Sequence, residues 1–157
     1  MFLFIPIKSA LMFYKENTGN VAAFLPVDRG ETFQITFTHS IHLTDVVETY
    51  SVTEDLKIRQ EEIVFEQFGI GMPANAEEGQ TFHYENGKYA VKNINKIFPS
   101  INIRNGKTVS EHRLSWEKEG QQKQVWFNDY FEPGDWFTVK VEKISVWDCL
   151  KGVKISG

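Results

Sequence analysis

The sequence predicts an all-β domain: a mostly antiparallel sandwich or partly open barrel of about eight to ten strands, with at most one short helix. Turn signals that contain glycine recur along the chain, among them Asn86-Gly87, Asn105-Gly106 and Glu119-Gly120. Residues that favour strands are abundant and include 13 Phe, 4 Trp and 5 Tyr. Several windows also alternate apolar and polar residues with a period of two, which places the apolar side chains on one face of a strand.

The first half of the chain contains the clearest of these windows. In 32–38, three apolar residues alternate with polar ones, which predicts a strand with one buried face. Asn86-Gly87 predicts a two-residue hairpin turn between strands at 82–85 and 88–91. The segment 93–98 could form one helical turn, which the following proline would end.

The second half continues the pattern. Glu119-Gly120 predicts a turn whose hairpin arms include 114–116 and 126–127. The segment 136–146 predicts a long strand, and its apolar register changes near Glu142-Lys143, where we expect a β-bulge.

Composition limits the class of protein. With 157 residues the chain can bury one self-sufficient core, so we expect 1–157 to form a single domain. A net charge of −4 argues against nucleic-acid binding, which needs a basic surface. The single cysteine, Cys149, excludes an internal disulfide and argues against a cysteine-rich zinc site. The apolar run within 1–9 is too short to span a membrane, and we interpret it as a remnant of an anchor or export segment. A membrane would then be a partner only if an anchor precedes this chain.

The most informative stretch is a hairpin predicted between residues 33 and 52. If Leu43-Thr44 forms its turn, His39 is opposed to Glu48, and both lie on the face that otherwise carries apolar side chains. Directly opposed residues are roughly 4.5–5.5 Å apart at Cβ. A buried carboxylate alone costs several kcal/mol, and an imidazolium beside it lowers that cost. The sequence therefore predicts a buried His39–Glu48 pair.

This pair has two interpretations: a polar pair that fixes the hairpin register, or part of a ligand or metal site. His42, Thr44 and Asp45 lie nearby, and imidazole with carboxylate groups can assemble a metal site. Ser40 follows His39 directly, but adjacent strand residues point to opposite faces, which argues against a serine nucleophile and its base. The sequence identifies no particular metal or cofactor.

Two further segments contribute candidate residues. Gly69-Ile70-Gly71 follows an apolar strand but lacks the third glycine and the helix start of a dinucleotide-binding loop. We expect a sharp strand exit there, or amide groups that face an anion. His112 shares a strand face with Leu114 and Trp116, so we expect it to point inward. It is either a core histidine with a backbone partner or a member of the His39/Glu48 cluster, and Arg113 should face outward.

Six short motifs occur together in this chain: Thr38-His39-Ser40, Val46-Val47-Glu48, the segment 68–73, His112-Arg113-Leu114, Pro133-Gly134-Asp135 and the segment 144–147. As a set they resemble the uncharacterised bacterial family called domain of unknown function 1850, over nearly the whole chain. One departure is Glu111, where the family usually has a neutral polar residue before His-Arg. The motif positions and the strand register together define the candidate ligand-binding residues: Thr38, His39, Ser40, Glu48, Gly69, Gly71, His112 and Arg113.

The resemblance implies a context and no established activity. Family members typically begin with a hydrophobic anchor or export segment, and they are often encoded beside TRAP transporters of the TAXI type, which take up small organic acids. We therefore expect a non-enzymatic, extracytoplasmic or membrane-associated accessory or binding module whose partners are TRAP-TAXI components. The alternatives are a small-ligand or metal-binding β domain that uses His39, Glu48 and His112, and a small hydrolase. The sequence does not specify an oligomeric state.

Overall fold

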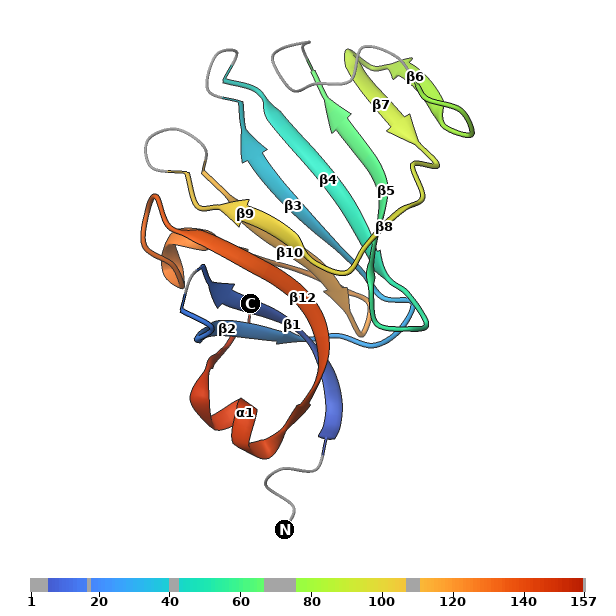
Figure 1. Ribbon diagram of the computed structural model, residues 1–157. Helices are drawn as coiled ribbons and strands as arrows, with labels where there is room; N and C mark the ends of the chain where they lie inside the picture. Colours follow the sequence, from blue (N-terminus) through green and yellow to red (C-terminus); the bar gives the residue numbers. More distant parts are fainter. Residues whose placement is uncertain (1–5, 17, 40–42, 67–75, 107–110, 157) are drawn as a thin grey trace.

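The structure of the chain is a computed structural model that describes residues 6–16, 18–39, 43–66, 76–106 and 111–156. It is an all-β sandwich of two mostly antiparallel sheets, and it does not close into a barrel, so the predicted fold class is confirmed (Figure 1). The described residues form thirteen strands, more than the eight to ten predicted, because three of them have no more than four residues.

The smaller sheet has five strands. Their spatial order is β13 (Val153–Lys154), β2 (Val21–Pro26), β1 (Pro6–Lys15), β12 (Trp136–Ser145) and β9 (Ile101–Arg104). All neighbours are antiparallel except β13 and β2. Residues 6–9 are the described part of the segment 1–9 that we interpreted as a remnant of an anchor or export segment. They belong to β1, which pairs with β12.

The larger sheet has eight strands. Their spatial order is β11 (Gln121–Trp126), β10 (Arg113–Lys118), β3 (Thr32–Thr38), β4 (Asp45–Val52), β5 (Ile58–Phe65), β7 (Lys88–Lys92) and β6 (Thr81–Glu85), and β8 (Lys96–Phe98) also pairs with β5. The predicted two-residue hairpin at Asn86-Gly87 is confirmed, since Glu85 pairs with Lys88. The predicted hairpin at Glu119-Gly120 is confirmed by the pairing of Lys118 with Gln121, although its second arm ends at Trp126 and Phe127 begins a 3-10 helix. Asn86 and Gly87 both have positive φ, which this type of turn requires.

The main core lies between the two sheets. The alternating apolar residues of β3 contribute Phe33 and Ile35, and Leu114 of β10 lies beside them. From the smaller sheet, Phe13 and Val139 are fully buried against this layer. Burial of an apolar side chain stabilises the fold by about 1.5–3 kcal/mol, so this two-sided layer is the main source of stability.

The outer face of the smaller sheet is also covered. The short helix α1 (Val146–Lys151) follows β12 and begins with a capping box between Ser145 and Asp148. Half-buried Cys149 packs there against Met12 and Ile144. The predicted bulge in β12 is wrong, because β12 pairs with β1 without a break from Phe137 to Ile144. Its apolar pattern changes because the opposite face of the strand becomes buried. The predicted helical turn at 93–98 is also wrong, since β8 occupies its end.

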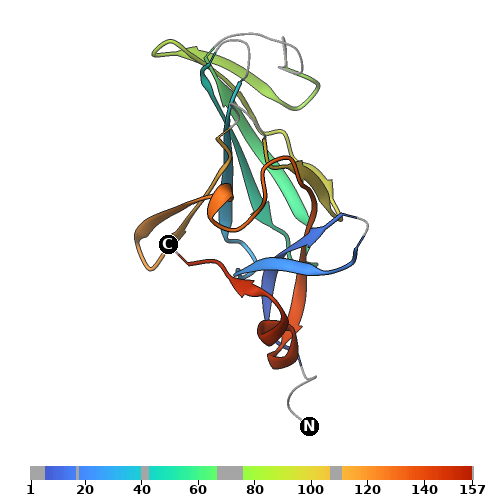
Figure 2. The same ribbon diagram turned by 90° about the vertical axis from the view of Figure 1, so that its left-hand side faces the viewer.

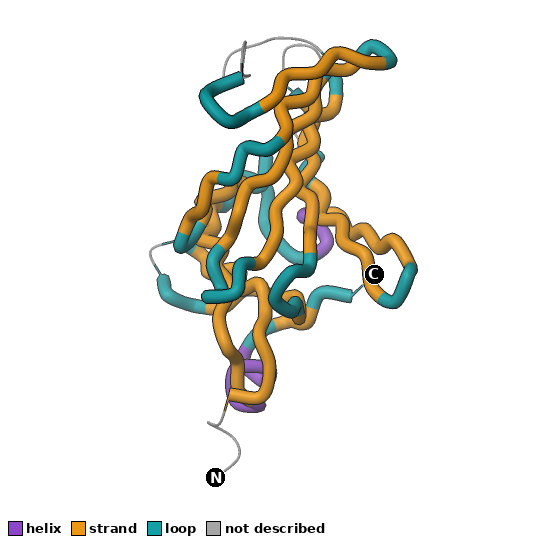
Figure 3. Tube along the Cα trace, turned by 90° about the vertical axis from the view of Figure 1, so that its right-hand side faces the viewer, coloured by secondary structure: helices purple, strands orange, loops and turns teal. Residues whose placement is uncertain are grey.

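The larger sheet extends well beyond the smaller one. In Figure 1, β4, β5 and β7 rise above the five-stranded sheet, and the side view in Figure 3 shows strands that extend above the body of the sandwich. A separate apolar cluster on this extension contains Val46, Ile63, Phe65 and Val91. At the other end of the eight-stranded sheet, the β10–β11 hairpin projects beside the C-terminal segment (Figure 2). Among the described residues, no helix has the length and hydropathy that a membrane span requires.

Candidate functional site

The β3–β4 hairpin has a different register from the predicted one. Phe33 is opposed to Tyr50, Ile35 to Glu48 and Thr38 to Asp45. The backbone N–H of His39 donates to the carbonyl of Thr44 at 2.8 Å, so the loop between the two strands contains four residues instead of the predicted two. Because the register slips by an even number of residues, every side chain keeps the predicted face. The predicted opposition of His39 and Glu48 is nevertheless wrong: Glu48 lies four residues beyond Thr44, or about 13 Å along the strand.

Glu48 has a different partner. The hydroxyl of Tyr50 donates a hydrogen bond to Oε2 of Glu48 at 2.5 Å, between two residues on the inner face of β4. Burial raises the pKa of the Glu48 carboxyl, and the Tyr50 hydrogen bond acts in the opposite direction. Burial also raises the pKa of the Tyr50 hydroxyl, with the Glu48 charge adding to that effect. The pair therefore consists of a neutral hydroxyl and a carboxyl group whose charge is disfavoured.

His112 points inward, as the sequence predicts. Its ring stacks on Phe37 at a centroid distance of 5.5 Å and contacts Phe127 at 5.3 Å. Nδ1 accepts a hydrogen bond from the backbone N–H of Gly106 at 3.3 Å, which fits a neutral ring protonated at Nε2. Burial, with a contribution from the Arg113 charge, lowers the pKa of His112 to about 4. This is the core histidine with a backbone partner that the sequence offered as one alternative.

The inner-face candidates do not form one cluster. β10, which follows His112, and β4, which carries Glu48, lie on opposite sides of β3, so two strand spacings, about 10 Å, separate them. His39 is buried at the end of β3. The described part of the chain contains no group of three or more His, Cys, Asp or Glu side chains that could hold a metal ion.

The outer face brings two of the candidates, Thr38 and Arg113, together through Asp45, which the sequence identified only as a polar residue near the turn. Asp45 Oδ1 accepts a hydrogen bond from the Thr38 hydroxyl at 3.0 Å and pairs with Nη2 of Arg113 at 2.8 Å. The guanidinium of Arg113 lies over the ring of Trp126 at 5.2 Å. We call these four residues, Thr38, Asp45, Arg113 and Trp126, the Arg113 array.

The exposure of the array is uneven. The Arg113 side chain is only 15% exposed, whereas Asp45 is 48% and Trp126 is 43% exposed. Nε of Arg113 is buried, and no acceptor among the described residues reaches it. A nearly buried guanidinium thus keeps one unsatisfied donor beside an exposed indole, although buried polar groups normally have a partner.

Sequence reasoning missed Trp126 and placed Asp45 only among the polar residues near the turn. The Glu119-Gly120 hairpin fixes Trp126 directly opposite Arg113, so the turn alone could have identified this neighbour. Three other residues of the candidate set, Ser40, Gly69 and Gly71, lie outside the described residues, and so does His42 of the metal hypothesis.

The topology defines a two-sheet β-sandwich domain. The family described as "Domain of unknown function (DUF1850)" matches residues 33–122, more than half of the chain, so the chain belongs to that family. The matched segment runs from β3 into β11 and includes Thr38, Asp45 and Arg113. No curated protein and no solved structure matches the chain.

Proposed function

We propose that this domain is a non-enzymatic, extracytoplasmic binding module that works with a TRAP-TAXI solute uptake system. The association with the transporter is supported by the usual gene neighbourhood of the family. The contact surface that we assign to it is supported by the Arg113 array on the outer face of β10, β3 and β4.

The observation that carries this assignment is the exposed indole of Trp126, which lies under the nearly buried guanidinium of Arg113 at 5.2 Å. Arginine and tryptophan are enriched among the residues that dominate binding energy at protein interfaces. A guanidinium held rigidly on both sides loses little conformational freedom when it binds, and its fork geometry suits a carboxylate. A partner that covers the exposed indole of Trp126 would therefore dock beside a guanidinium that is already fixed in place.

The inner-face residues favour a structural role over catalysis. Nδ1 of His112 is already bonded to Gly106, and the carboxyl of Glu48 is bonded to Tyr50. A general base must reach the proton that it removes, directly or through one water molecule. No observation on the described residues favours the hydrolase alternative or the metal site.

The proposal is tested by chemical crosslinking of the domain in cells, followed by capture and identification of neighbouring TRAP-TAXI components. Trp126→Ala should abolish capture. Trp136→Ala is the matched control, because Trp136 is 49% exposed and also lies under an arginine, Arg104, but on the smaller sheet. Failure of the unmodified domain to capture any transporter component would overturn the association, and equal capture by Trp126→Ala would overturn the assigned surface.

A further inference from the structure

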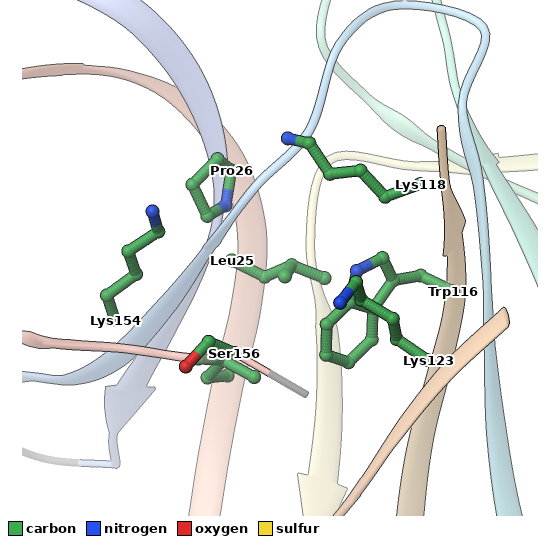
Figure 4. A pocket seen from close by; sticks show the side chains of 8 residues that line it. Leu25, Pro26, Trp116, Lys118, Lys123, Lys154 and Ser156 are labelled. Atoms are coloured by element: carbon green, nitrogen blue, oxygen red, sulfur yellow. The ribbon is translucent and has the colours of Figure 1, made fainter. Parts of the chain in front are cut away.

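A pocket of about 180 Å³ lies at one edge of the sandwich, away from the Arg113 array. It opens between the edge strand β11 of the larger sheet and the edge strand β13 of the smaller one. Eight residues line it: Leu25, Pro26, Trp116, Lys118, Lys123, Lys154, Ile155 and Ser156 (Figure 4). Six of these eight lie outside the family match at 33–122.

The floor of this pocket is apolar. Leu25, Trp116 and Ile155 are at most 6% exposed and belong to the main core. An apolar cavity of about 150 Å³ is large enough to bind benzene. The pocket can therefore receive an apolar group of about one ring, which would lie against the indole of Trp116.

The rim of the pocket is cationic. Lys118 from β10, Lys123 from β11 and Lys154 from β13 surround the apolar floor. Figure 4 shows the Nζ ends of Lys118 and Lys154 on either side of Pro26. Neither of these two lysines forms an ion pair with a carboxylate among the described residues. Three lysines around one small pocket create a local positive potential on a chain whose net charge is −4.

We infer that this pocket binds a small amphipathic monocarboxylate: an apolar group of about one ring that carries one carboxylate. The apolar group occupies the floor against Trp116, and the carboxylate remains at the rim within reach of Lys118 and Lys154. An inorganic anion would leave the apolar floor empty, and a neutral ring would leave Lys118 and Lys154 without a counter-charge among the described residues. This combination of an apolar wall and a few convergent polar groups is typical of small-molecule sites.

The inference goes beyond the proposed function and does not depend on it. Trp116 and Lys123, which are opposed in the β10–β11 pair, lie on the inner face of the sheet, whereas Arg113 and Trp126 lie on its outer face. Loss of partner capture by Trp126→Ala would therefore leave the pocket intact, and loss of ligand binding at the pocket would leave the Arg113 array intact.

The test is a titration of the isotope-labelled full chain with benzoate, followed by nuclear magnetic resonance. We expect the indole N–H signal of Trp116 to shift in a saturable way. Lys118→Gln/Lys154→Gln should weaken benzoate binding at least about tenfold. Lys8→Gln/Lys143→Gln is the matched control, because it makes the same charge change at two exposed lysines that do not line the pocket, and it should bind benzoate as the unmodified chain does.

Three further measurements decide the inference. Ser156→Phe, which places a ring in the pocket from an exposed position, should compete with benzoate and weaken its binding. Benzamide, acetate and inorganic phosphate should each bind at least about tenfold more weakly than benzoate, because each lacks either the charge or the apolar group. The inference is overturned if benzoate leaves the Trp116 signal unchanged, if the Lys118/Lys154 variant binds benzoate as well as the control does, or if phosphate or benzamide binds as tightly as benzoate.

Discussion

Tyr50 and Glu48 lie side by side on the inner face of β4, and the Tyr50 hydroxyl donates to the Glu48 carboxyl at 2.5 Å. The carboxyl therefore has a neutral donor where the sequence predicted a histidine. A neutral hydroxyl does not compensate a buried charge as an imidazolium would, which is consistent with the raised pKa of Glu48.

Glu48→Gln tests this arrangement. Because the pKa of Glu48 is raised in the folded chain, protonation favours the folded state: the contribution of Glu48 to stability is full at low pH and is lost as the pH rises through its folded-state pKa. Glutamine stays neutral and can still accept from Tyr50. The Tm of Glu48→Gln minus the Tm of the unmodified chain should thus be more positive at about pH 8 than at about pH 4. The opposite trend would indicate that a cation stabilises the Glu48 carboxylate, as the His39–Glu48 hypothesis requires.

The pH dependence of His112 has the opposite sign. Its pKa falls from the ordinary 6.5 to about 4 on folding, so the unfolded chain takes up a proton below pH 6.5 that the folded chain does not. The contribution of His112 to stability is full above pH 6.5 and is lost as the pH falls toward 4. Between pH 7 and pH 5 the loss is about 2 kcal/mol.

Denaturant unfolding of His112→Gln at these two pH values measures the effect. The variant should lose about 2 kcal/mol less than the unmodified chain does. His83→Gln is the control, since it makes the same substitution at an exposed histidine of β6. A His112 ring that titrates near its ordinary value in a nuclear magnetic resonance experiment would contradict the structural assignment.

Asp45→Asn tests the Arg113 array. The substitution keeps an acceptor for Thr38 but removes the charge that pairs with Arg113, whose side chain is only 15% exposed. Hydrogen bonds to charged groups contribute about 1.5–3 kcal/mol, so we expect a loss of about 1–2 kcal/mol in unfolding free energy because Asp45 is half-exposed. Asp55→Asn is a matched control, because Asp55 also accepts from a threonine, Thr53, and pairs with a cation, Lys57, at a more exposed site. An equal effect of the two substitutions would show that the Arg113 pair is an ordinary surface ion pair.

Local signals determined how much of this fold could be predicted. Asn86-Gly87 and Glu119-Gly120 allow only tight turns, so both hairpins and their registers follow from the sequence. The β3–β4 connection has no such signal, and its register depends on a longer loop in which Leu43 has a positive φ of 55°. The faces were predicted correctly because a four-residue slip preserves the alternation of side chains, but the predicted opposition of His39 to Glu48 was wrong.

The same reasoning explains the misplaced helix and the missed array. The helix forms after Ser145, where Ser145 and Asp148 make a capping box. The segment 93–98 has only a weak helical pattern, and Asn93 and Asn95 take positive φ values there. The Arg113 array takes one residue from each of four adjacent strands, β11, β10, β3 and β4. No single motif contains its members, so it becomes visible only once the strand order is known.

Asn105 links the end of β9 to the segment before β12, and its substitution is the last prediction. Its side chain is 1% exposed, and Nδ2 donates to Asn128 Oδ1 at 2.9 Å and to the carbonyls of Phe131 and Glu132 at 3.3 and 3.2 Å. Asn105→Ala removes this donor, which leaves the buried carbonyl of Phe131 and two partly buried acceptors without it. Each unsatisfied buried group costs about 1–3 kcal/mol, so we expect a loss of about 2–4 kcal/mol in denaturant unfolding.

The same substitution should also reach His112, because the next residue, Gly106, donates its N–H to the imidazole. If Asn105 positions this loop, Asn105→Ala weakens that hydrogen bond and admits water to the ring, and the pKa of His112 should move up toward its ordinary value. Asn102→Ala is the control, because Asn102 lies on exposed β9 surface and only accepts from Thr138. It should change neither the unfolding free energy by more than about 0.5 kcal/mol nor the titration of His112. A large loss of stability with an unchanged His112 titration would mean that Asn105 holds the β9–β12 connection without positioning Gly106.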